Sequence, residues 1–80
     1  MDKKAEILQA TLNDNIGLAT IIENGSVVEL LTIGSQKSFE GKEYIENFYD
    51  CIDKGLLKHK EGQSYRITSN GKEYLKNITK

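Results

Sequence analysis

The chain has 80 residues, of which 38% are hydrophobic and 29% are charged, and its net charge is -1. These values predict one small folded domain over residues 1–80 and exclude a disordered chain, which would have fewer apolar residues and a large net charge. They also exclude a uniformly basic protein that coats nucleic acid, and the single cysteine excludes an internal disulfide and a zinc site made of several thiolates.

The first segment, residues 2–12, has the pattern of a helix. Ala5, Leu8 and Leu12 recur at helical spacing and would share one face. The next three residues are Asn-Asp-Asn, whose side chains compete for backbone hydrogen bonds. We therefore expect the helix to end before residues 13–15.

The following segment, residues 16–33, fits two different structures. One is a β-hairpin with strands over residues 18–23 and 26–33. Asn24-Gly25 between them suits a type I′ turn, and β-branched residues on both sides favour strands.

The other structure for this segment is a pair of short helices. Ser26 and Glu29 are spaced as a capping box, and Gly34 could end the second helix. Because the segment shows neither strict alternation nor a clean helical stripe, its own pattern leaves both structures open.

The second half of the chain has clearer boundaries, and its first element is a helix over residues 38–54. Ser38 can cap the start of this helix and Gly55 can stop its end. A broad apolar face is expected on one side, with acidic residues on the other. The apolar face consists of Tyr44, Ile45, Phe48, Tyr49, Cys51 and Ile52.

A two-stranded hairpin and a last helix complete the predicted elements. Leu56-Leu57 leads into a polar tip at residues 58–63, and residues 64–68 alternate as a strand. Thr68 can cap the last helix. One face of this helix would carry Gly71, Tyr74, Leu75 and Ile78. The expected fold class is α+β.

Two runs of sequence, residues 49–57 and 65–75, resemble the winged helix-turn-helix family. They read Tyr-Asp-Cys-Ile-Asp-Lys-Gly-Leu-Leu and Tyr-Arg-Ile-Thr-Ser-Asn-Gly-Lys-Glu-Tyr-Leu. In that family a recognition helix enters the wing through a Gly-Leu-Ile type step. The returning wing strand ends in a Tyr-Arg-Leu-Thr type sequence, and a glycine-containing helix closes the domain. The resemblance covers roughly residues 38–79.

The resemblance also bears on the ambiguous segment. It implies a helix just before the recognition helix, and for this reason we favour a helix over residues 27–33. A variant in which a hairpin replaces that helix stays open, because the turn over residues 34–38 is long and Asn24-Gly25 is a hairpin signal.

The uneven distribution of charge bears on function. Residues 54–80 hold seven Lys and Arg against two Glu, a net charge of +5, whereas residues 39–53 hold one Lys against five acids, a net charge of -4. Because an electric field depends on how charge is distributed, the C-terminal part can bind a polyanion locally. The alternative is that these cations are only solvated.

The winged-helix resemblance implies DNA binding, with the recognition helix in the major groove and the wing on the backbone. The wing carries Lys58, Lys60 and Arg66, which suit phosphate oxygens. We therefore predict a transcriptional regulator that contacts duplex DNA mainly through its basic wing. The predicted DNA-contacting residues are Lys37, Ser38, Lys42, Asn47, Lys58, His59, Lys60, Gln63, Ser64 and Arg66.

The acidic side of the helix over residues 38–54 supports a second hypothesis, because carboxylates repel phosphate. In this alternative the chain is a protein-interaction adaptor or a small inhibitor. It would dock on a protein partner through Glu43, Glu46, Asp50 and Asp53.

Catalysis, metal binding and membrane insertion are not predicted. Cys51 and His59 are the only thiol and imidazole, and Cys51 fits a buried structural position. No apolar run approaches the roughly 18 residues of a membrane span, and the first residues lack the apolar stretch of a signal peptide. We expect a cytoplasmic protein without a cofactor. If it forms a homodimer, Leu8, Leu12 and residues 16–22 are the candidate contacts.

Overall fold

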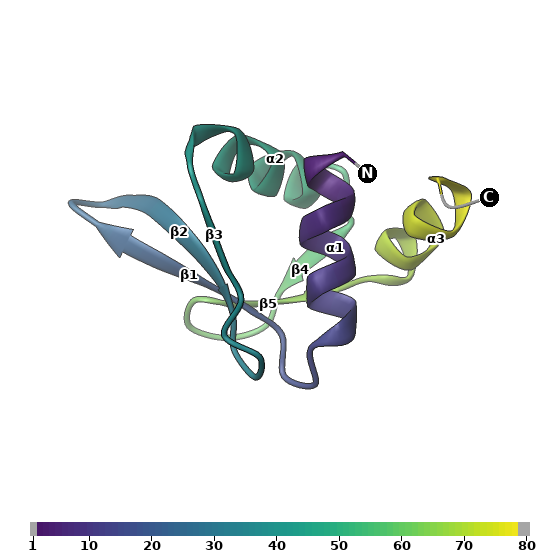
Figure 1. The fold of residues 1–80 in the computed structure, drawn as a ribbon, viewed down its shortest axis with the longest axis horizontal. Coiled ribbons are helices and arrows are strands. Elements are labelled where there is room, and N and C mark those ends of the chain that lie inside the picture. Colours follow the sequence, from purple (N-terminus) through teal and green to yellow (C-terminus); the bar gives the residue numbers. More distant parts are fainter. Residues whose placement is uncertain (1, 79–80) are drawn as a thin grey trace.

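The computed structural model describes residues 2–78 and contains three helices and one five-stranded antiparallel sheet (Figure 1). The elements in chain order are α1 (Lys3–Asn13), β1 (Leu18–Glu23), β2 (Ser26–Thr32), β3 (Ser38–Glu40), α2 (Lys42–Asp53), β4 (Leu57–His59), β5 (Ser64–Ile67) and α3 (Ser69–Ile78). The strand order across the sheet is β3-β2-β1-β5-β4, so β1 is the middle strand. This architecture confirms the predicted α+β class.

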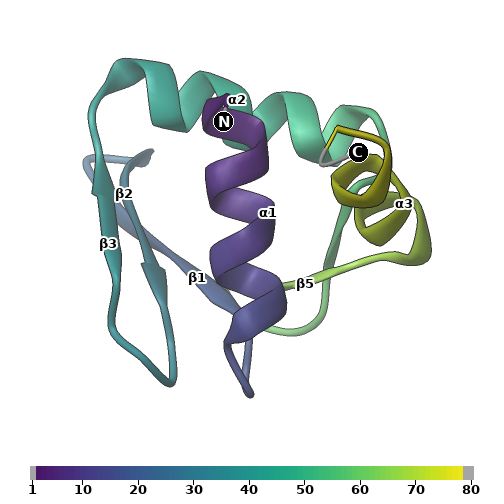
Figure 2. The same ribbon diagram turned by 45° about the vertical axis from the view of Figure 1, so that its right-hand side comes forward.

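All three helices lie on one face of the sheet, which leaves the other face without a helix (Figures 1 and 2). Side chains in a strand alternate between the two faces. Leu18 and Leu30 point toward the helices and are fully buried, whereas Ala19 and Leu31 point away and are half-buried. We call the helix-free side the open face.

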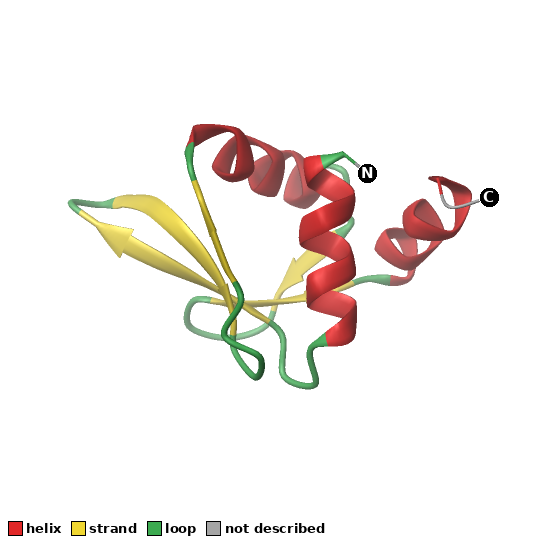
Figure 3. Ribbon diagram, viewed as in Figure 1, coloured by secondary structure: helices red, strands yellow, loops and turns green. Residues whose placement is uncertain are grey.

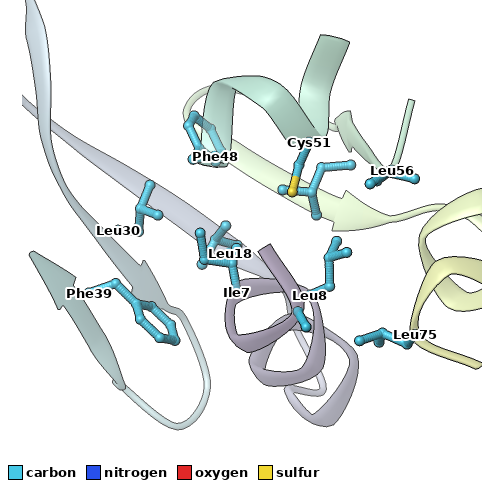
Figure 4. Packing of buried hydrophobic residues seen from close by; sticks show 11 residues of the cluster. Ile7, Leu8, Leu18, Leu30, Phe39, Phe48, Cys51, Leu56 and Leu75 are labelled. Carbon is cyan, nitrogen blue, oxygen red and sulfur yellow. The ribbon is translucent and has the colours of Figure 1, made fainter. Parts of the chain in front are cut away.

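The hydrophobic core fills the space between the helices and the covered face of the sheet (Figure 4). Helix α1 contributes Ile7 and Leu8, and α2 contributes Phe48 and Cys51, all of them fully buried. Burying one such large apolar side chain contributes about 1.5–3 kcal/mol to folding. These buried side chains therefore hold α1 and α2 against the covered face of the sheet.

Helix α1 confirms the prediction for residues 2–12 to within one residue at each end. Asp2 caps it, because its side chain accepts a 2.7 Å hydrogen bond from the backbone N–H of Ala5.

Beyond the helix, Asp14 joins two loops. Its carboxylate accepts hydrogen bonds of 2.7–3.0 Å from the N–H groups of four residues, Ile16, Gly17, Gly34 and Ser35.

The segment before α2 corrects the favoured expectation of a helix over residues 27–33. Strands β1 and β2 form a hairpin instead, and Asn24 and Gly25 at its turn have φ values of 52° and 79°. Both residues thus have the positive φ that a type I′ turn requires. Leu30 and Thr32 alternate with exposed or half-buried neighbours, so the burial pattern has the period of a strand.

The start of α2 is also corrected (Figure 3). Ser38 does not cap this helix; it begins β3, and its hydroxyl donates to the Glu29 carboxylate. The strand places Phe39 opposite Leu30, which buries the ring in the core. The helix begins at Lys42, four residues later than predicted, whereas its end at Asp53 agrees with the prediction to one residue.

The elements that follow α2 confirm the predicted hairpin and last helix. Lys58 and His59 belong to β4, so the polar tip is shorter than expected. Thr68 links the turn after α2 to the first turn of α3. Its hydroxyl donates to the Gly55 carbonyl at 2.6 Å and accepts from the N–H of Gly71 at 3.0 Å. A side chain at Gly71 would lie 2.4 Å from the carbonyl oxygen of Leu56, so only glycine fits where α3 meets the sheet.

Membrane insertion through a helix can be assessed from the same elements. Among residues 2–78, no helix has both the length and the apolar character that crossing a membrane requires.

Candidate nucleic-acid interface

The β4–β5 hairpin places two cations side by side on the open face. Lys58 lies directly opposite Arg66 in the antiparallel ladder. Their neighbours Leu57 and Ile67, which are also paired, point toward the helices. Side chains alternate along both strands, so Lys58 and Arg66 point away from the core and into solvent.

Aromatic and backbone contacts hold this hairpin in place. The Tyr65 ring meets the Phe48 ring of α2 edge-on, with centroids 5.0 Å apart, and meets the His59 ring at 5.3 Å. At the tip, His59 Nε2 lies 2.7 Å from the Gly62 carbonyl oxygen, and the Ser64 hydroxyl donates to the Glu61 carbonyl. The cations therefore stand on a hairpin that is anchored to the core.

The charges of the hairpin are not neutralised within the described chain. Residues 2–78 form three ion pairs, and none of them includes Lys58, Lys60 or Arg66. Like charges that face each other across two strands destabilise a sheet. The Lys58–Arg66 pair thus lowers the stability of the isolated chain and leaves two cations available to an anion.

The cations border a groove that continues to the first residue of α3. Its volume is about 570 Å³. It is lined by Lys58, His59, Lys60, Arg66, Ile67, Thr68 and Ser69. Ammonium and guanidinium groups donate charge-assisted hydrogen bonds to phosphate oxygens, and the Ser69 hydroxyl is a further donor or acceptor. The groove is therefore suited chemically to a phosphate backbone.

The ten predicted DNA-contacting residues are divided between separate parts of the fold. Six of them lie in the β4–β5 hairpin, where Gln63 and Ser64 adjoin the basic side chains. Ser38 and the preceding Lys37 are at β3, which is the opposite edge strand of the sheet. The Lys37 ammonium lies over the Phe39 ring, 5.4 Å from its centroid.

The remaining two predicted residues belong to α2. Lys42 is exposed at the start of the helix. The Asn47 amide donates to the Glu43 carbonyl at 2.7 Å, one turn earlier in the same helix. The structure thus brings the hairpin residues together but does not bring Lys42 or Asn47 to them.

Helix α1 lies beside α2 (Figure 2), and two of its lysines form ion pairs with acids of α2. Lys3 pairs with Glu43 at 3.1 Å, and Asp50 pairs with Lys4 at 2.8 Å and Lys54 at 2.9 Å. The hydrogen bonds from Lys4 and Lys54 lower the pKa of the Asp50 carboxyl. Two of the four predicted protein-docking acids are therefore neutralised within the chain.

The other two acids of the predicted docking surface, Glu46 and Asp53, are exposed and belong to none of the ion pairs among residues 2–78. Sequence reasoning missed Lys3 and Lys4 as the partners of α2, although two lysines at the start of a helix were a visible signal. It also missed Ser69, which borders the groove because α3 begins there, two residues after the end of β5.

Other chemistry has little support from the described residues. Cys51 is fully buried, and burial raises the pKa of its thiol to about 12, which favours the protonated form at neutral pH. Within residues 2–78, no three His, Cys, Asp or Glu side chains are grouped so that they could hold a metal ion. Leu8, a predicted dimer contact, is fully buried inside the chain.

Comparison of the chain with protein-family models, with curated proteins and with solved structures finds no match. The function is therefore argued from the geometry of the hairpin and its groove.

Proposed function

We propose that the chain is a DNA-binding regulator that grips the phosphate backbone of duplex DNA with its β4–β5 hairpin. The observation that carries this proposal is the Lys58–Arg66 pair, two unneutralised cations facing each other at the edge of a basic groove. Contacts to phosphate position a protein on DNA without reading sequence. In this proposal the hairpin supplies affinity, and the chain is cytoplasmic.

The order of elements supports a winged-helix interpretation of the C-terminal half. Helix α2 leads through Gly55 into the β4–β5 hairpin, and Thr68 leads from the hairpin into α3. Strand β5 pairs with β1, which ties the hairpin to the N-terminal half. The departure from the family's pattern is the β1–β2 hairpin and β3, which stand where a helix would precede α2. In this proposal α2 takes the place of the recognition helix.

The ion pairs between α1 and α2 also support DNA binding. Glu43 and Asp50 would repel phosphate if they were free, but Lys3, Lys4 and Lys54 offset them. The repulsion that α2 presents to a duplex is thereby reduced to Glu46 and Asp53. A duplex held by the hairpin meets a weaker negative field than the sequence suggests.

The test is fluorescence anisotropy of a labelled mixed-sequence duplex at about 50 and 200 mM salt. Binding driven by phosphate contacts has a Kd of about 10⁻⁴–10⁻⁶ M at physiological salt and weakens steeply as salt rises. The triple variant Lys58→Ala, Lys60→Ala, Arg66→Ala should lose this binding. The slope of log K against log salt should fall by up to about 3, one for each phosphate contact removed.

Two double variants distinguish the effect of where the positive charges lie from the effect of the net charge. Lys58→Ala with Arg66→Ala and Lys37→Ala with Lys42→Ala each remove two positive charges. The first pair lies in the β4–β5 hairpin, and the second lies just before β3 and at the start of α2. The first double variant should weaken duplex binding by at least tenfold more than the second. Equal effects would mean that overall charge matters and the hairpin does not, which would contradict the proposal. If the wild-type chain does not bind the duplex at about 50 mM salt, the result would instead favour a protein partner that docks on Glu46 and Asp53.

A further inference from the structure

The open face of the sheet has an apolar centre that no helix covers. Ala19 and Ile21 of β1 and Leu31 of β2 are half-buried by their neighbours, and none of them is among the apolar residues packed against the core. Figures 1 and 2 show the helices on the opposite face. A sheet normally buries an apolar face against another layer of structure, so this centre is suited to a partner.

Two like-charged pairs of opposite sign flank this centre. On one side Glu29 of β2 lies directly opposite Glu40 of β3, and on the other Lys58 of β4 lies opposite Arg66 of β5. None of the ion pairs formed by residues 2–78 includes any of these four side chains. Each pair destabilises the isolated chain. The open face thus has an acidic end and a basic end, both without a neutralising charge.

The position of β1 makes this face complementary to itself. β1 is the middle strand of the five, so the acidic end and the basic end lie on either side of it. When two copies face each other, a twofold axis between the sheets can exchange the two ends. The acids of each copy then face the cations of the other, and the two apolar centres meet. A twofold contact requires that one patch serve both copies, and this patch does.

We infer that the open face is the interface of a homodimer, in which a second copy covers Ala19, Ile21 and Leu31. Glu29 and Glu40 of each copy are neutralised by Lys58 and Arg66 of the other. The dimer covers two of the cations that the proposed duplex contact uses, so a second copy and a duplex exclude each other. Dimerisation itself does not require DNA binding, and its test contains no DNA.

The test is the mass of the chain in solution by sedimentation, measured from about 5 to 500 μM at low salt. The wild-type mass should rise with concentration from 9.0 kDa to twice that value. Two reversed variants are compared with it, Glu29→Lys with Glu40→Lys and Lys58→Glu with Arg66→Glu. Each variant alone places like charges at both contacts, so its dimer should be at least about 100-fold weaker.

Mixing the two reversed variants gives the decisive measurement. One carries cations at both ends of the face and the other carries carboxylates at both ends, so together they should form a 1:1 heterodimer. As a matched control, Glu46→Lys with Asp53→Lys changes the same charges on α2 and should leave the dimer intact. Circular dichroism confirms that each variant is folded.

Three results would overturn the inference. The first is a wild-type mass of 9.0 kDa at about 500 μM and low salt. The second is a dimer that persists in both reversed variants, which would place the interface elsewhere on the chain. The third is a failure of the mixed variants to associate although each of them is monomeric and folded.

Discussion

Two neighbouring residues of β2, Leu30 and Leu31, show how differently the two faces of the sheet are used. Leu30 is fully buried under the helices and faces Phe39, whereas Leu31 lies half-buried on the open face and is not among the apolar residues packed against the core. The covered face holds apolar side chains that fill the core, and the open face holds charged side chains that belong to none of the ion pairs among residues 2–78. The covered face therefore specifies the fold, and the open face is available for binding.

The largest expected effect separates these two leucines. Leu30→Ala leaves a cavity in the core and should lower the free energy of unfolding by about 2–5 kcal/mol. Leu31→Ala should lower it by less than about 1 kcal/mol, because Leu31 is only half-buried and is not packed against the core. Urea denaturation at a protein concentration below dimer formation measures both. Equal losses would show that the open face is as important to the fold as the covered face.

A smaller effect on stability is expected at Asp14, whose carboxylate joins the loop before β1 to the loop after β2. The N–H of Gly17, and with it those of Ser35, Ile16 and Gly34, lowers the pKa of this carboxyl well below its usual range. A carboxyl whose pKa is lowered in the folded chain adds stability that is complete above its unfolded pKa of about 3.9 and is lost as pH falls below it. The melting temperature of wild type should therefore fall between about pH 5 and pH 2.

The variant Asp14→Asn should melt lower than wild type at pH 7 and should show a shallower dependence on pH. Asp53→Asn, which changes an exposed carboxylate of α2, is the matched control and should keep the wild-type pH profile. A wild-type profile in Asp14→Asn would mean that the hydrogen bonds at Asp14 do not stabilise the loops.

The smallest effect has the opposite sign. Lys58→Glu replaces a repulsion with an attraction opposite Arg66, so it should raise the free energy of unfolding by about 0.2–1 kcal/mol while it weakens duplex binding. Lys60→Glu makes the same charge change at the exposed tip, outside the strand pairs, and should leave stability within about 0.5 kcal/mol of wild type. Thermal melts and anisotropy measure the two quantities. A loss of stability in Lys58→Glu would contradict the assignment of unneutralised charge to this pair.

Local patterns in the sequence predict most of the C-terminal half of the fold. Gly55 and Thr68 mark the ends of elements because the first has a φ of 73° and the second caps α3. The helix over residues 2–12 is predicted from a similarly local signal, the helical spacing of Ala5, Leu8 and Leu12. Each of these signals acts between residues close in sequence, and such signals can be read without knowing the fold.

The errors occur where contacts distant in sequence decide the structure. Residues 27–32 are in a strand because β2 pairs with both β1 and β3, and residues 38–40 are a strand because Phe39 reaches the core opposite Leu30. The capping signals at Ser26 and Ser38 are overridden by these pairings. The basic cluster of the candidate site was predicted because its members share one hairpin. Its separation from Lys37 and Lys42 depends on the strand order of the whole sheet.

The burial of Cys51 provides a way to measure how often the helices separate from the sheet. It is the only thiol, and it is fully buried between α1 and α2 under the covered face. A thiol reagent in solution can reach it only when the helices separate from the sheet, so the rate of labelling measures how often that happens. Binding at the open face does not uncover Cys51. The labelling rate therefore reports the stability of the helical layer separately from binding on the other side of the sheet.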